Sequence, residues 1–134
     1  MGYIYGEDRN QIQFYTSTLE EFIGEDNPVR FIDAFVEQLD IAELGIGRAE
    51  PASTGRPPYN PKDLLKLYIY GYFNRIRSSR RLMMESGRNI ELFYLLNRLS
   101  PDFRTISDFR KKNAKALRNV FKAFVKVCID LKTI

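Results

Sequence analysis

The strongest concentration of side chains suited to recognition chemistry is the segment Arg77–Arg81, which reads RSSRR. Arginine can donate two parallel hydrogen bonds to a phosphate or to the edge of guanine, and serine hydroxyls can hydrogen-bond phosphates. Ser78 and Ser79 are also typical helix N-caps, and the free N–H groups and dipole of a helix N-terminus attract anions. The segment therefore predicts either a nucleic-acid contact or a capped surface helix whose arginines are only solvated.

A second basic group follows at helical spacing near the end of the chain. Intervals of four, three, four and four residues place its members within about 80° of arc on a continuous helix. Such a stripe is able to follow a phosphate backbone, but a solvated helix face has the same pattern, and Asn113 is a point where the helix can break. The stripe consists of Lys111, Lys115, Arg118, Lys122 and Lys126.

Several classes of site are excluded by residues that the sequence lacks. It contains no histidine and a single cysteine, Cys128, so Ser-His or Cys-His catalysis, zinc-finger ligand sets and an internal disulfide are ruled out. The acidic residues after position 54 are scattered, and no glycine-rich phosphate loop occurs, so no carboxylate set for two-metal catalysis is indicated. We therefore predict no catalytic residue, no metal site and no cofactor in this chain.

The net charge of +4 conceals two parts of opposite sign. Residues 1–54 carry three basic and eleven acidic side chains, a net charge of −8, whereas residues 55–134 carry eighteen basic and six acidic ones, a net charge of +12. The basic part predicts a polyanionic partner. No apolar run approaches the roughly 20 residues that span a bilayer, and no signal peptide is indicated. We therefore expect a cytoplasmic protein without a membrane partner.

We divide the chain into an acidic part, residues 1–54, and a basic part, residues 55–134, and expect both to belong to one structural domain. A loop rich in glycine and proline joins the two parts. The acidic part contains several helical signals. Asn27 followed by Pro28 is an N-cap and first-position signature, and apolar residues recur after it at helical spacing. This helix is too short to form a core alone, so its apolar stripe is expected to pack on the later helices. Before it, we expect an extended arm over residues 1–16 and a short helix over 19–23, capped by Ser17 or Thr18.

The basic part is predicted to contain a helix–turn–helix. Asn60 and Pro61 repeat the cap-then-proline signal and begin a helix over 61–75 that is apolar nearly all round, as in a buried central helix. Gly71 lowers the helix propensity by about 1 kcal/mol, which predicts close packing at that point. We predict an all-α, compact multi-helix domain with a helix–turn–helix-like core and an extended or short-helical N-terminal arm. The helices expected after the turn at 74–77 cover 79–86, 89–96, 106–112 (capped by Thr105) and 113–131.

Two further features keep two interpretations each. The segment GRPPY, residues 55–59, is typical of a rigid polyproline linker, which we favour, but it also fits a basic arm that enters a minor groove. Tyr68, Tyr70 and Tyr72 can stack on bases, although their helical spacing favours a place in the core for most of them.

The segments GRPPYNP, LLKLYIYGYFNRIRSSRRL and RNIELFYLLNRLSPDFRTISDFRKKN resemble the N-terminal domain of insertion-sequence transposases of the InsH type. The resemblance implies binding to the terminal inverted repeats of a mobile element. In such enzymes an Asp-Asp-Glu catalytic domain of ribonuclease-H fold follows, with its acidic triad and divalent metal. That domain would begin after Ile134, so the resemblance implies that this chain does not cut DNA. It also implies that Arg104 and residues 110–112 form a second basic block.

We therefore predict the DNA-binding N-terminal domain of a transposase, which recognises terminal inverted repeats in DNA transposition and recombination and is not an enzyme by itself. One alternative is an assembly module that pairs protomers through the stripe 31–39 and the aromatic-rich helix at 64–73. Another is a truncated remnant that represses the full enzyme.

The expected partner is double-stranded DNA, with a homodimer also considered and no small-molecule substrate, and the expected location is the cytoplasm, in association with the nucleoid. The candidate DNA-binding residues are Arg77, Ser78, Ser79, Arg80, Arg81, Arg104, Arg110, Lys111, Lys112, Lys115, Arg118 and Lys122.

Overall fold

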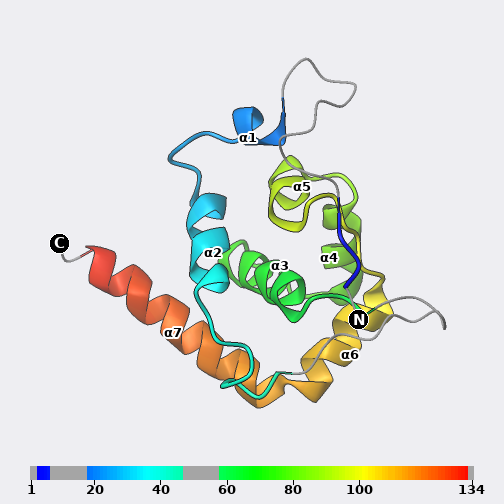
Figure 1. Cartoon of the computed structure of the whole chain (residues 1–134), viewed down its shortest axis with the longest axis vertical. Helices are drawn as coiled ribbons and strands as arrows, with labels where there is room; N and C mark the ends of the chain where they lie inside the picture. Colours follow the sequence, from blue (N-terminus) through cyan, green and yellow to red (C-terminus); the bar gives the residue numbers. More distant parts are fainter. Residues whose placement is uncertain (1–2, 7–17, 47–57, 133–134) are drawn as a thin grey trace.

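The computed structural model describes residues 3–6, 18–46 and 58–132, so most of the predicted arm and of the loop containing GRPPY lie outside the described residues. The described parts contain seven helices and no strand, which confirms the predicted all-α fold (Figure 1). The helices are α1 Leu19–Phe22, α2 Pro28–Glu37, α3 Pro61–Phe73, α4 Ser79–Ser86, α5 Ile90–Leu96, α6 Phe103–Lys112 and α7 Ala114–Lys132.

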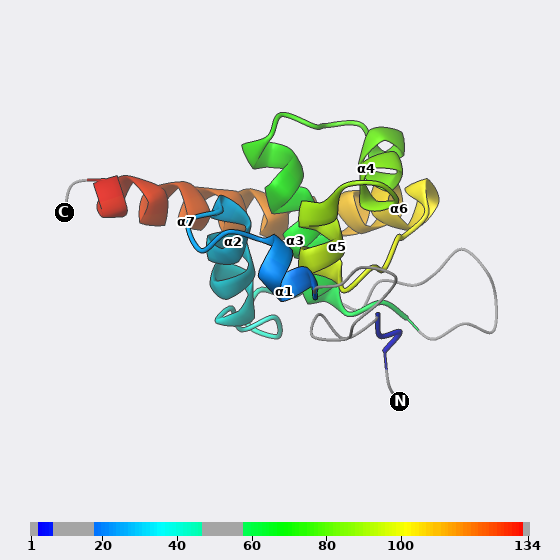
Figure 2. The same cartoon turned by 90° about the horizontal axis from the view of Figure 1, so that it is seen from above.

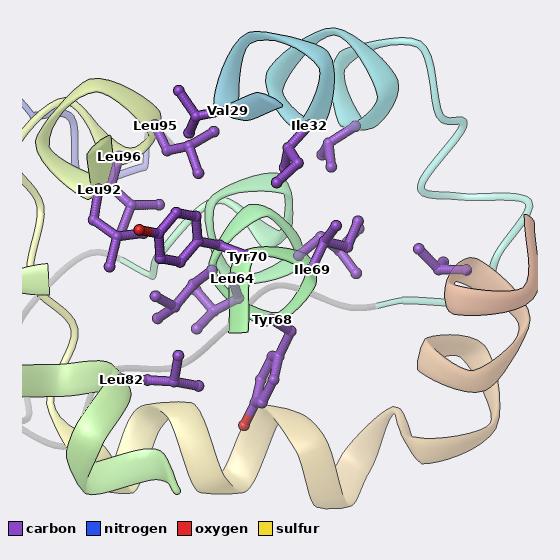
Figure 3. Packing of buried hydrophobic residues seen from close by; sticks show 14 of the residues in the cluster. Val29, Ile32, Leu64, Tyr68, Ile69, Tyr70, Leu82, Leu92, Leu95 and Leu96 are labelled. Atoms are coloured by element: carbon purple, nitrogen blue, oxygen red, sulfur yellow. The ribbon is translucent and has the colours of Figure 1, made fainter. Parts of the chain in front are cut away.

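Helix α3 occupies the centre of the molecule, with the other long helices around it (Figure 1). Leu64, Leu65 and Ile69 on this helix are fully buried. Leu64 and Ile69 lie among apolar side chains from α2 and α5, including Ile32 and Leu92 (Figure 3). The predicted buried central helix is therefore confirmed, and the apolar stripe of α2 packs on later helices as expected.

Three helices begin with the same asparagine cap. The side-chain oxygen of Asn27 accepts from the Val29 N–H at 2.9 Å, and that of Asn60 accepts from the Lys62 N–H at 3.0 Å, each just before a proline at the first helical position. Asn89 caps α5 in the same way. The caps satisfy N–H groups that lack a partner within the helix, which explains why the sequence placed these three starts correctly.

Close packing at Gly71 is confirmed, and it also explains the turn after α3. A Cβ atom on Gly71 would lie 2.6 Å from the Ile76 carbonyl oxygen and 2.9 Å from Leu82 Cδ2, so only glycine fits. The Ile76 N–H donates to the Gly71 carbonyl at 2.7 Å, and Arg75 has a left-handed φ of 60°. Helix α3 therefore ends at Phe73, two residues earlier than predicted, and the chain turns tightly towards α4.

The predicted start of α6 was wrong by three residues. Thr105 was expected to cap this helix, but the helix begins at Phe103 with Asp102 at the N-cap position. Thr105 is buried in the first turn, and its hydroxyl donates to the Asp102 carboxylate. Asp102 is itself a preferred N-cap residue, but it follows Pro101 in what the sequence suggested was a loop, and its side chain caps no backbone N–H.

Helix α7 starts after a break at Asn113 and covers α2 and the end of α3. The Phe124 ring lies 5.6 Å from that of Phe31 and 5.2 Å from that of Phe35, between centroids. Beyond this contact α7 extends past the other helices (Figure 2). Leu131 was expected on the buried face of this helix, but it is 54% exposed. The apolar pattern of α7 therefore extends beyond the residues that pack on the core.

Helices α2 and α3 are also joined by charged side chains that the sequence pattern did not reveal. Lys66 is buried on α3, and its Nζ lies 2.8 Å from an Asp33 carboxylate oxygen and 2.7 Å from one of Glu37. Asp63 lies nearby, and its burial raises its carboxyl pKa to about 6, against the opposing attraction of Lys66. We call Asp33, Glu37, Asp63 and Lys66 the α2–α3 charge cluster.

Candidate nucleic-acid interface

The start of α4 presents three arginines to solvent. Ser78 caps the helix, because its Oγ accepts from the Arg81 N–H at 3.4 Å, and Leu82 one position later is fully buried and anchors the helix. With the helix fixed this way, the side chains of Arg77, Arg80 and Arg81 are all exposed. The predicted cap at this position is confirmed, and the charged groups around it point outwards.

Helix α6 brings a second group of arginines to the same place, because α4 and α6 pack directly together. The guanidinium of Arg80 lies 4.1 Å from the centroid of the Phe103 ring, and that of Arg104 lies 6.0 Å from the same ring. At the other end, Arg110 Nη2 donates to the Arg77 carbonyl at 2.6 Å. Two basic segments distant in sequence thus form one surface.

We call Arg77, Arg80, Arg81, Arg104 and Arg110 the α4–α6 basic face. None of these five side chains forms a salt bridge with a carboxylate among the described residues. This differs from Arg88 at the far end of α4, which pairs with Glu85 at 2.5 Å. The basic face therefore holds its charge unneutralised, as an anion-binding surface requires.

Ser79, the first residue of α4, is half-buried, whereas the remaining basic candidates are exposed but do not form the predicted single stripe. Lys111 and Lys112 end α6, whereas Lys115, Arg118 and Lys122 lie on α7, beyond the break at Asn113. The arc of about 80° predicted for Lys111, Lys115, Arg118, Lys122 and Lys126 requires one continuous helix. The prediction that all five share one helix face was therefore wrong, and only the last four lie on the same helix, α7. Lys112 and Lys115 border a cavity of about 350 Å³ where the two helices meet.

The three tyrosines of α3 separate into two kinds. Tyr68 is buried, its hydroxyl donates to the Ile106 carbonyl and its ring lies 5.2 Å from the Arg110 guanidinium. Tyr70 is buried too, and its hydroxyl donates to Glu91 at 2.5 Å. Burial is the main cause that raises the pKa of this hydroxyl, and the hydrogen bond to Glu91 raises it further. Tyr72 is 51% exposed. Core positions are thus confirmed for two of the three, and only Tyr72 is open to stacking.

Sequence reasoning missed Phe103 as part of this surface. Its ring supports Arg80, and the attraction of a cation to an aromatic face limits the orientations that the guanidinium can adopt. An available signal was the Phe-Arg pair at 103–104 next to a helix start, but this pair gives no indication that Arg80 lies on the ring. Only the packing of α4 on α6 brings those two residues together.

The surfaces assigned to protomer assembly are largely used inside the chain. Ile32, Phe35 and Val36 of the α2 stripe are buried, as are the residues of α3 from Leu64 to Tyr70. Within the described ranges, no three acidic, histidine or cysteine side chains are grouped so as to hold a metal ion. The same residues include no helix with the length and apolar character that a bilayer span requires.

Comparison with known proteins identifies the family. The profile of the transposase domain family DUF772 matches residues 17–112, from just before α1 to the end of α6. The matched range includes the α2–α3 charge cluster and the whole α4–α6 basic face. Comparisons with curated proteins and with solved structures gave no significant match. Since the matched residues form most of the chain, this protein belongs to the transposase domain family DUF772.

Proposed function

We propose that this transposase domain binds double-stranded DNA at the terminal inverted repeats of a mobile element, through the α4–α6 basic face. The observation that carries the proposal is the meeting of two separate basic segments around Phe103, with five arginines exposed and without a salt bridge among the described residues. DNA has one negative charge about every 1.7 Å along its axis, so such a surface would release counterions on binding.

In this proposal α3, the turn after it and α4 act as a helix–turn–helix. The first residues of the second helix would face the major groove, where Arg80 and Arg81 can each donate two hydrogen bonds to guanine. Arg104 and Arg110, across the α4–α6 contact, would bind phosphates and fix the register. The basic residues at the end of α6 and on α7 would extend the phosphate contacts.

The proposal assigns DNA binding to these residues and strand cutting to a separate Asp-Asp-Glu domain of ribonuclease-H fold, as in transposases of the InsH type. Support within the chain comes from three acidic residues whose carboxylates are engaged in contacts within the fold. Asp33 and Glu37 pair with Lys66, and Glu91 hydrogen-bonds both Tyr70 and the Asn27 amide. A repressor that occupies element ends would use the same DNA contacts.

The test is duplex binding by a double variant, R80A with R81A, measured by fluorescence anisotropy over a range of salt concentrations. We expect affinity to fall at least about ten-fold, because each lost arginine contact is worth roughly 1–3 kcal/mol at a base edge. If both residues contact phosphates instead, the slope of log K against log salt should decrease in magnitude by about two.

The matched control is K62A with R88A, which removes the same charge from residues already paired with Glu37 and Glu85. This variant should retain affinity within about two-fold, since both charges are already paired with carboxylates of the same chain. Equal losses in both double variants would show that only net charge matters, and would contradict the assignment to the α4–α6 basic face. Unaltered binding in both would place the DNA contact elsewhere on the protein.

A further inference from the structure

A groove lined by aromatic rings begins at the edge of the α4–α6 basic face. Its first part is a cavity of about 210 Å³ lined by Tyr68, Tyr72, Ile76, Arg77, Arg110 and Phe121. Its second part, about 480 Å³, shares Tyr72 and Phe121 and continues along α7 past Lys122, Lys126 and Ile129. We call these two cavities together the aromatic groove.

Tyr72 and Phe121 form a stacked pair in the middle of this groove. Their ring centroids are 5.0 Å apart and the rings are inclined by 17°. Phe121 covers one side of Tyr72, yet Tyr72 remains 51% exposed and lines both cavities. A further planar ring can continue the stack on the open side of Tyr72, with the apolar contact that this exposed ring lacks in the free protein.

The charges on the groove have a single sign. Arg77 and Arg110 line the first cavity, Lys122 and Lys126 line the second, and no acidic side chain of the described part of the chain lines either cavity. Arg77 and Arg110 also belong to the basic face, so the groove continues the same positive surface. Aromatic rings between spaced cations are the arrangement by which proteins hold single-stranded nucleic acid, with rings stacking on bases and cations following the phosphates.

We infer that the aromatic groove binds unpaired nucleotides of a DNA strand that leaves the duplex held by the α4–α6 basic face, with a base stacked on Tyr72. This inference rests on the proposed function and specifies its substrate as DNA with an unpaired segment. The first cavity is smaller than the roughly 300 Å³ at which drug-sized ligand sites begin, which suits one base. An apolar protein segment would instead leave four cations at the rim without counter-charge.

The experiment compares a blunt duplex with the same duplex carrying a short single-stranded extension that contains the fluorescent base 2-aminopurine. We expect the extension to tighten binding by at least about five-fold and its fluorescence to be quenched by stacking. Y72A and Y72L should lose both effects while binding the blunt duplex normally. Y72F keeps the ring and should keep both effects, and Y5A, which removes a tyrosine that is 79% exposed and outside the groove, should do the same.

Each failure has a distinct signature. If the blunt duplex binds normally but the 2-aminopurine fluorescence is not quenched, the inference is wrong and the proposed function stands. The same holds if Y72L retains the quenching. Quenching of the extension without any binding of the blunt duplex would overturn the proposed function, and of the inference only base stacking on Tyr72 would remain. If Y72L leaves nucleotide binding unchanged but alters self-association in sedimentation, the groove is an interface between copies of the chain and the inference is wrong.

Discussion

The α2–α3 charge cluster and the α4–α6 basic face use charged side chains in opposite ways. In the cluster, Lys66 is 4% exposed and neutralised by two carboxylates. On the basic face, Arg80 and its neighbours are exposed, and the nearest support is an aromatic ring or a carbonyl. A charge paired within the fold stabilises the fold, whereas a charge held without a counter-ion remains available to an external anion. This difference decides which charged residues are assigned to DNA.

The largest expected effect comes from breaking the cluster with K66M. The substitution keeps much of the side-chain volume but leaves Asp33 and Asp63 in a partly buried site without their cation. Loss of one partner of a buried pair costs about 3–5 kcal/mol, and we expect about 3 kcal/mol because Glu37 is 54% exposed and can turn to solvent. Urea denaturation measures the change in the free energy of unfolding.

Two companion variants sharpen this prediction. K62M removes a half-buried lysine whose Nζ lies 3.9 Å from the same glutamate, at the limit of an ion pair, and should cost less than about 1 kcal/mol. D33L added to K66M should recover most of the loss, because well-packed apolar residues often replace a buried ion pair without penalty. DNA affinity should be unchanged in all of these variants while they are folded. A K66M variant as stable as the parent would show that the cluster does not hold α2 on α3.

Much of the fold could be predicted because its signals are local. Asn27 and Asn60, each followed by a proline, predict two helix starts, and both predictions are confirmed. Gly71 predicted close packing because glycine inside a helix needs a compensating reason. The start of α6 was missed because Thr105 with Asp108 three residues later imitates a cap signal, whereas the true N-cap residue, Asp102, follows a proline that is typical of a loop.

The remainder depends on contacts between residues distant in sequence. Arg110 donates to a carbonyl 33 positions away, and Lys66 pairs across two helices. Helical periodicity places a residue on one side of its own helix, but it does not identify the helix that packs there. The basic segments could therefore be selected from the sequence, whereas their union around Phe103, and the aromatic groove beside it, required the packing of α4, α6 and α7.

A smaller and pH-dependent effect is expected from D63N. Burial raises the carboxyl pKa of Asp63 from 3.8 to about 6, with Glu37 and Asp33 adding to the shift and Lys66 opposing it. The folded protein therefore keeps a proton that the unfolded chain has released, and stability contributed by this group falls as pH rises from about 4 to about 6. Above pH 6 the folded state carries an unfavourable charge.

Asparagine has no such charge, so D63N should be more stable than the parent by about 1–2 kcal/mol at neutral pH. A full shift of two pKa units would correspond to roughly 3 kcal/mol, and partial solvent exposure reduces it. Thermal melts between about pH 4 and pH 8 should show the gain vanish at the acidic end. A constant difference across this range would mean that Asp63 is not the titrating group.

The smallest effect tests whether the basic face owes its order to Phe103. F103L keeps apolar packing and removes the ring that lies 4.1 Å from the Arg80 guanidinium. A cation–aromatic contact at an exposed site contributes about 0.5–1 kcal/mol, so DNA affinity should fall about two- to five-fold as Arg80 loses its fixed orientation. The control is F93L on α5, which removes an aromatic ring whose centroid lies 4.8 Å from the Arg98 guanidinium. Both variants should lose similar stability, but only F103L should weaken DNA binding; equal affinities would show that the ring supports the fold and not the basic face.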